Sequence, residues 1–188
     1  MPEQDDENER LEALSQRFMR ALSLKQEGDV DKAEDELRAV LREEPRLPEP
    51  HLELARVLLD TGRLTEAESH AREGLEHLAN TGPWTEEIPD NVLEALANAL
   101  LAEILRRRAD EDDVIFGDPA VFHKMVEESK QAFARAAELD PSDEYSSYYA
   151  FFLGAEGHGG PVELELAPAE PDRPGDPHDP DDPDPADG

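Results

Sequence analysis

The chain has 188 residues, and its 48 acidic residues outnumber its 18 basic residues to give a formal net charge of −30 at pH 7. This charge repels nucleic acids and anionic lipid surfaces, so we expect no nucleic acid and no membrane as a partner, and a basic partner is favoured. Because the sequence contains no cysteine, disulfides, thiolate metal sites and cysteine nucleophiles are excluded.

Residues 1–155 are predicted to be helical throughout. In the segment GDVDKAEDELRAVL, which starts at Gly28, apolar residues recur at the spacing of one helix face, and no alternating strand pattern competes. The segment GRLTEAESHAREGL, which starts at Gly62, repeats this pattern. Each glycine lies where a preceding helix must stop, so Gly28 and Gly62 are predicted to form the turns between paired helices.

A spacing of 34 residues relates positions 14–47 to positions 48–81. Seven pairs of residues are identical at this offset. They are Ala21 and Ala55, Leu24 and Leu58, Gly28 and Gly62, Ala33 and Ala67, Glu34 and Glu68, Arg38 and Arg72, and Leu41 and Leu75. Small residues allow two antiparallel helices to approach closely, and glycine permits the turn between them. Each unit is therefore predicted to be a helix-turn-helix that buries its apolar face only by stacking on a neighbour.

The third unit is predicted to be interrupted. A first helix near residues 90–108 is followed by an insertion at 109–118, and a second helix then ends in KQAFARAAELDP. The segment SDEYSSYYAFFLG comes next and has the pattern of a fourth unit that is cut short. We therefore expect the helical part to close near residue 155.

Aromatic residues concentrate in this closing segment. Tyr145 and Tyr149 fall on one helix face and are expected to cover the preceding helix, as a capping helix must. Phe151 projects off that face. Two interpretations stay open: Phe151 packs under the insertion around Ile115 and Phe116, or it forms an association surface with Tyr145 and Tyr149, most simply that of a symmetric homodimer.

Residues 156–188 form a separate segment that cannot build a core. This segment holds half of the 16 prolines and one basic residue, and a proline recurs at every third position from Pro168 to Pro183. Such a period is that of a polyproline II helix. We expect a disordered, solvated, acidic and proline-rich tail, with an arm that binds a partner or the chain itself as the alternative.

The repeated units resemble the tetratricopeptide repeat family, and in particular small bacterial proteins with about three repeats. Leu54 and Ala55 are similar to the family's first-helix pattern, and Gly62 is similar to its turn glycine. Arg17 and Arg20 depart from the pattern because they stand where the family has apolar residues, which predicts a shifted register for the first helix. The resemblance implies an all-α fold of antiparallel helix-turn-helix repeats stacked as a short right-handed α-solenoid.

In tetratricopeptide arrays the first helix of each pair lines a concave groove that holds a peptide. The resemblance therefore implies a non-enzymatic scaffold or adaptor that binds a peptide segment of a partner protein through apolar anchors. Carried over to this sequence, the groove residues are Phe18, Leu22, Lys25, Leu52, Arg56, Leu59, Asn98 and Leu101.

One further function is disfavoured by the sequence, and two alternatives remain. Arrays that clamp the acidic C-termini of heat-shock chaperones use more cations and asparagines, so Phe18, Leu22 and Glu53 disfavour that subtype. A chaperone similar to those of type III secretion, holding apolar stretches of secreted proteins, remains one alternative. An acidic surface that mimics nucleic acid and binds a basic protein remains the other.

No pattern predicts catalysis, a cofactor or a metal site, so we expect no enzyme and assign no catalytic or metal-binding residue. His70 and His77 lie two helical turns apart along one face, too far to share an ion. His123 and Glu127 could supply half a metal site, but a solvated helix face is the simpler interpretation. The N-terminus has no signal-peptide pattern, and no apolar run could span a membrane, so a soluble, cytoplasmic protein is expected.

Overall fold

The computed structural model describes residues 2–85 and 88–156, and in these residues it contains eight α-helices and no strand. The helices are α1 (Pro2–Glu27), α2 (Val30–Glu43), α3 (Pro48–Asp60), α4 (Leu64–Thr81), α5 (Asp90–Ala109), α6 (Asp112–Ile115), α7 (Pro119–Leu139) and α8 (Glu144–Glu156). The predicted all-α class is therefore confirmed. The predicted tail lies, apart from Glu156, outside the described residues. None of the described helices combines the length and the hydropathy that a membrane span requires.

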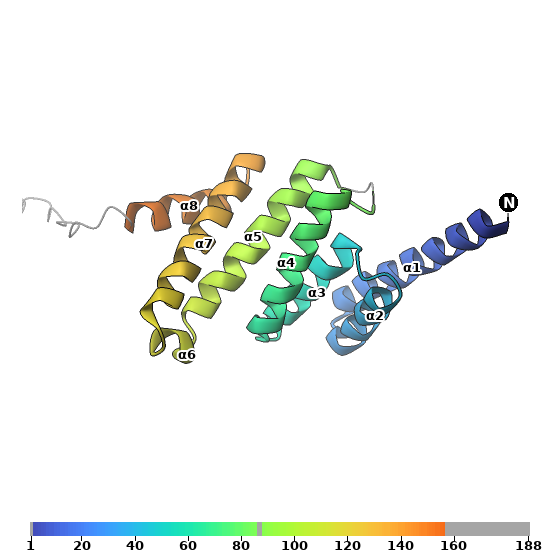
Figure 1. The fold of residues 1–188 in the computed structure, drawn as a ribbon, viewed down its shortest axis with the longest axis horizontal. Helices are drawn as coiled ribbons and strands as arrows, with labels where there is room; N and C mark the ends of the chain where they lie inside the picture. The colour runs from blue at the N-terminus through green and yellow to red at the C-terminus, as the bar shows by residue number, and fades with distance from the viewer. Residues whose placement is uncertain (1, 86–87, 157–188) are drawn as a thin grey trace, which may run out of the picture. The chain divides into compact units, whose positions relative to one another are not determined.

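The helices pair in chain order (Figure 1). Helix α1 packs on α2, α3 on α4, and α5 on α7, and contacts of α2 with α3 and of α4 with α5 join each pair to the next. The predicted insertion contains the short α6, which packs against α7. Asp118 caps the start of α7, because its side chain accepts a hydrogen bond from the Ala120 N–H at 2.9 Å.

The two turns inside the first pairs have the same geometry. Gly28 and Gly62 adopt the left-handed conformation, with φ of 87° and 77°. The residues that follow them donate their N–H groups to the carbonyls of Leu24 and Leu58, at 2.9 and 2.8 Å. This arrangement satisfies the last carbonyls of each helix and requires a residue that accepts positive φ. The repeated glycines are therefore fixed by local backbone geometry.

Helix α1 buries Leu14 and Phe18 in the core shared by the first two pairs. Arg17 and Arg20, the two departures from the family pattern, instead pair with Glu36 of α2 at 3.2 and 3.7 Å. Both arginines thus lie at the polar edge of the contact between α1 and α2. The two charged side chains are accommodated there because Glu36 of α2 supplies a carboxylate to both.

The second helix of each pair carries a repeated set of ion pairs. Glu34 and Arg38 of α2 pair with each other at 2.8 Å. Glu34 also pairs with Arg63 at 2.7 Å, and Arg38 with Glu66 at 3.0 Å, both at the start of the next hairpin's second helix. These contacts link α2 to α4.

The same arrangement returns one unit later. Glu68 and Arg72 of α4 pair at 2.8 Å, and they also pair with Arg108 at the end of α5 and with Glu128 of α7. Burial acts to raise the pKa of Glu68, but hydrogen bonds from Arg108 and Arg72 outweigh it and lower that pKa below its ordinary value. Two of the seven sequence identities therefore recur because they form the same contact between successive units.

Helices α3 and α4 approach each other closely at Gly74. A Cβ atom added there would lie 2.8 Å from Cδ2 of Leu52 and 3.3 Å from Cβ of His51. Both neighbours belong to α3 and are buried. The absent side chain of Gly74 therefore sets how near the two helices come.

We expect Gly74→Ala to lower the thermal midpoint of unfolding. Replacing a helical glycine by alanine ordinarily stabilises a helix by about 1 kcal/mol. Here the added methyl group overpacks the contact with Leu52, and overpacking costs about 1–3 kcal/mol. The matched control is the same change in a Leu52→Ala background, where space is available and the substitution should be neutral or stabilising. Calorimetry that found equal stabilisation in both backgrounds would contradict the close contact.

Candidate functional site

The apolar residues assigned to the groove are largely used to hold the helices together. Phe18, Leu52, Leu59 and Leu101 are 5%, 7%, 7% and 9% exposed and belong to the hydrophobic core. Leu22 is half-buried against the same core. Their assignment to a peptide groove stays a prediction, and any contact with a peptide would have to come from the edges of these side chains.

The polar groove residues of the first two units lie together. Lys25 of α1 forms an ion pair with Glu53 of α3, and Arg56 approaches the same carboxylate at 4.0 Å. All three side chains are partly exposed. Glu53 therefore engages both of the cations that the sequence places on this surface.

The residues assigned from the third unit lie elsewhere. Asn98 donates a hydrogen bond to the carbonyl of Glu94 on its own helix at 2.8 Å. Asn98 and Leu101 also line a hollow together with Arg72 of α4 and Glu128 of α7. The structure therefore brings Lys25 and Arg56 to one anion but places the α5 residues beside the second helices of the neighbouring pairs.

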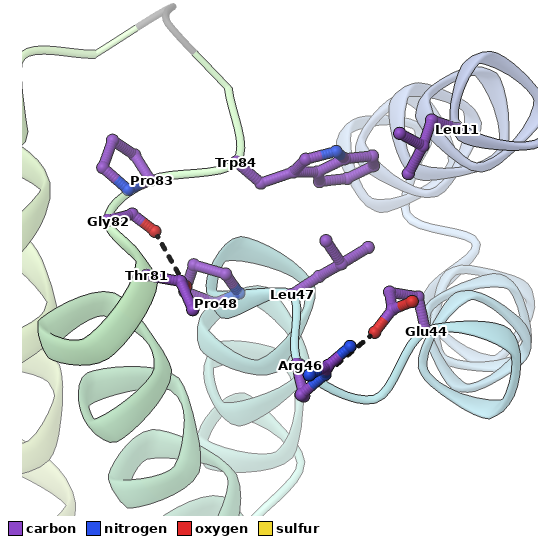
Figure 2. A pocket seen from close by; sticks show the side chains of 9 residues that line it. All are labelled: Leu11, Glu44, Arg46, Leu47, Pro48, Thr81, Gly82, Pro83 and Trp84. Carbon is purple, nitrogen blue, oxygen red and sulfur yellow. Dashed lines mark hydrogen bonds and ion pairs between the residues drawn. The ribbon is translucent and has the colours of Figure 1, made fainter. Parts of the chain in front are cut away.

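A pocket that the sequence did not reveal lies between α1, the connection from α2 to α3, and the residues that follow α4 (Figure 2). Its volume is about 390 Å³. Figure 2 shows the indole of Trp84 extending toward Leu11, with Leu47 nearby. The lining residues are Leu11, Glu44, Arg46, Leu47, Pro48, Thr81, Gly82, Pro83 and Trp84. Most of these side chains are apolar, and the Glu44–Arg46 ion pair, at 3.4 Å, adds a polar group to the lining. Such a lining suits an apolar group.

Trp84 is held in place by a buried carboxylate. Glu49, in the first turn of α3, is 6% exposed and accepts hydrogen bonds from the backbone N–H groups of Trp84 and Thr85 at 2.9 and 2.8 Å. It also accepts one from the Thr85 hydroxyl at 3.2 Å. The indole packs on Phe18 with ring centroids 5.6 Å apart. Trp84 is thus positioned before any partner arrives.

The closing helix α8 uses its tyrosines for capping. The rings of Tyr145 and Tyr149 pack on Phe133 of α7, with centroids 5.9 and 5.1 Å away, which agrees with the predicted capping role. The hydroxyl of Tyr145 donates to Glu103 at 2.8 Å, and burial together with that carboxylate raises the pKa of Tyr145. Because Tyr145 and Tyr149 are engaged by α7 and Glu103, only part of each ring is available for the predicted association surface.

Phe151 remains on the outside of α8. It is 77% exposed, and Phe116 in the insertion is 83% exposed, so neither ring buries the other. Of the two interpretations given above, packing of Phe151 under the insertion is therefore wrong. The association surface stays a prediction.

Comparison with known proteins connects this geometry to a family. The family model for the tetratricopeptide repeat matches residues 24–84. A solved structure of the first tetratricopeptide domain of Spaghetti (RPAP3), bound to the HSP90 peptide SRMEEVD, is similar with a TM-score of 0.56. The alignment has 12% identity and covers 78% of this chain and 94% of that chain, so the likeness concerns the fold. A search of curated proteins gave no significant match. Residues 24–84 therefore carry the sequence pattern of the tetratricopeptide repeat, and helical pairs continue beyond them.

Proposed function

We propose that the protein is a non-enzymatic interaction scaffold that binds a peptide segment of a partner protein. The peptide would run along the first helices of the repeats and place one large apolar side chain in the Trp84 pocket. The single observation that carries this proposal is the pocket itself, in which Trp84 is fixed by the buried carboxylate of Glu49.

Preorganisation supports the pocket as the anchor site. A binding surface gains affinity when its side chains are ordered before the partner arrives, because less conformational entropy is then lost on binding. The hydrogen bonds from Trp84 and Thr85 to Glu49, and the packing of the indole on Phe18, supply that order. Aromatic anchors of this kind dominate the binding energy of many interfaces.

Charge determines which peptide fits. The chain has a formal net charge of −30, and Lys25 and Arg56 are both engaged by Glu53. A peptide with basic residues beside its apolar anchor is attracted by such a surface, whereas an acidic peptide is repelled. The acidic peptide in the similar solved structure is therefore a poor guide to the ligand of this chain.

Selection from a random peptide library against the full-length protein should enrich peptides with a large apolar residue next to lysine or arginine. For a selected, fluorescently labelled peptide, Trp84→Ala should raise the Kd by about thirtyfold, since loss of an aromatic anchor costs about 2 kcal/mol or more. Leu11→Ser, at the exposed rim, should also weaken binding. The matched control is Phe116→Ala, which removes an exposed ring outside the pocket. Equal losses for Trp84→Ala and Phe116→Ala, with helicity unchanged, would overturn the pocket as the anchor site.

The salt dependence of the same peptide separates an apolar anchor from an acidic mimic of nucleic acid. Raising the salt from about 0.1 to about 0.5 M shortens the Debye length from about 10 to about 4 Å. We expect binding to weaken less than about tenfold, because contacts with the pocket are not screened. Fluorescence anisotropy that showed complete loss of binding at the higher salt would favour the mimic.

The exposed ring of Phe151 generates a separate prediction about self-association. A symmetric contact through α8 would bury this ring against its equivalent in a second copy, and we expect a concentration-dependent dimer in analytical ultracentrifugation. Phe151→Ser should give a folded monomer. A wild-type chain that remains monomeric at high micromolar concentration removes this contact. A mutant that loses helicity would instead assign Phe151 a role in packing.

A further inference from the structure

A histidine pair joins α3 to α4 away from the Trp84 pocket. The Nδ1 atoms of His51 and His70 are 3.0 Å apart, and the two rings have centroids 5.2 Å apart. His51 is 3% exposed, whereas His70 is half-buried. Glu73 lies one turn after His70 on α4, and its carboxylate oxygen is 3.8 Å from Nδ1 of His51. These three side chains are not used by the proposed peptide site.

The surroundings of His51 fix which of its ring nitrogens carries the proton. Its Nε2 atom lies 2.8 Å from the carbonyl oxygen of Pro45. A carbonyl oxygen can only accept, so Nε2 must donate, and the lone pair of the neutral ring is then on Nδ1. That lone pair faces His70 and Glu73. A ring N–H donated to a backbone carbonyl is the arrangement that orients metal-binding histidines in proteins.

Burial favours the protonation state that a metal requires. It disfavours the charged form of both imidazoles and so lowers the pKa of His51 and of His70 below the ordinary histidine value. A metal ion binds the neutral form of imidazole. His51 already presents a lone pair on Nδ1, and the Nδ1–H of His70 donates a hydrogen bond to it. His70 must therefore carry its proton on Nε2 before its own Nδ1 can bind the ion.

The distances match a small transition-metal ion. One nitrogen from each histidine and one oxygen of Glu73 lie within 4.8 Å of one another. In a tetrahedral zinc site with metal–nitrogen bonds of about 2.0–2.1 Å, neighbouring ligand atoms are about 3.3 Å apart. The two nitrogens would need to separate by a few tenths of an ångström. The side chain of Glu73 is 48% exposed; its Oε1 accepts a hydrogen bond from the Ser69 hydroxyl at 2.9 Å, and its Oε2 is the oxygen nearer His51.

We propose that His51, His70 and Glu73 bind a divalent transition-metal ion of the zinc type, with water in the fourth position. Two imidazoles and a carboxylate are ligands that suit zinc and neighbouring metals rather than calcium or magnesium. A pocket of about 370 Å³ opens onto the three side chains and provides room for the water. The ion would fasten α3 to α4 beside their close contact at Gly74 and thereby stabilise the fold.

Nearby charged and aromatic groups set the strength of the site. Arg38 and Arg42 line the same pocket and oppose a cation, although Arg38 is already paired with Glu34 and Glu66. The ring of His77 lies 5.5 Å from that of His51, one turn beyond Glu73. His77 therefore packs against the cluster without supplying one of the three ligand atoms.

Cobalt(II) is the probe that tests the proposal, because its visible absorption reports tetrahedral coordination and its release by zinc reports competition for one site. Full-length protein freed of metal with a chelator should develop this absorption up to one equivalent of cobalt. The variant His70→Gln/Glu73→Gln should not. A matched control is His123→Gln/Glu127→Gln, which removes an exposed histidine and glutamate from α7 and should bind as the wild type does. All variants keep residues 157–188, so any binding there is a common background.

Thermal unfolding with and without zinc gives a second readout. Zinc should raise the midpoint of the wild type and of the α7 control but not that of His70→Gln/Glu73→Gln, since an ion that binds only the folded state stabilises it. If the double variant is unfolded, Glu73→Gln alone tests the site: loss of even an outer-shell partner lowers metal affinity by about 10–100-fold, and loss of a ligand should cost at least as much. Absence of a tetrahedral spectrum in the wild type, or equal binding by the folded His70→Gln/Glu73→Gln variant, would overturn the proposal.

Discussion

Helix α3 is buried along nearly its whole length, with ten of its 13 residues removed from solvent by α2, α4 and α5. This burial is the constraint on which the rest of the structure depends, because a helix enclosed on several sides cannot leave a polar side chain unpaired. Two of its buried residues are polar, Glu49 and His51. Each must find partners inside the protein, and each organises one of the two candidate sites.

Glu49 satisfies its carboxylate with the backbone of the connection between α4 and α5. The N–H groups of Trp84 and Thr85 converge on it, and this draws the connection back across the start of α3 toward α1. His51 satisfies one nitrogen with the carbonyl of Pro45 and directs the other at His70. The same burial thus positions an aromatic side chain at one place and a nitrogen lone pair at another.

The two helices of each pair have different structural roles. First helices supply most of the buried apolar residues, such as Leu54 and Ile104, which makes them the structural centre of the array. Second helices connect successive units through repeated ion pairs, as Glu68 does with Arg108. A chain with this net charge benefits from such pairs, since each removes a carboxylate from the mutual repulsion of the surface. The surfaces left for the proposed peptide binding are edges, connections and the ends of helices.

The sequence by itself determined the features that depend on local geometry. The left-handed turns require glycine at positions 28 and 62, and the fully buried position 55 favours the small side chain of alanine. Because the same requirements return in each unit, these residues recur with a period of 34. The interruption of the third unit is also visible in the local sequence pattern, as is the packing of Tyr145 and Tyr149 on the second helix of that unit.

Only the tertiary structure decided how distant residues meet. Trp84 is held by Glu49, which lies 35 positions earlier, and no local pattern encodes that hydrogen bond. Along one helix His70 and His77 are too far apart to share an ion, whereas the close pair joins His70 to His51 on another helix. Leu52 has the spacing of a groove residue, yet its side chain is packed against α4 because Gly74 opens a space there. Periodicity reveals which face of a helix is apolar, but the neighbouring helices determine whether that face is covered.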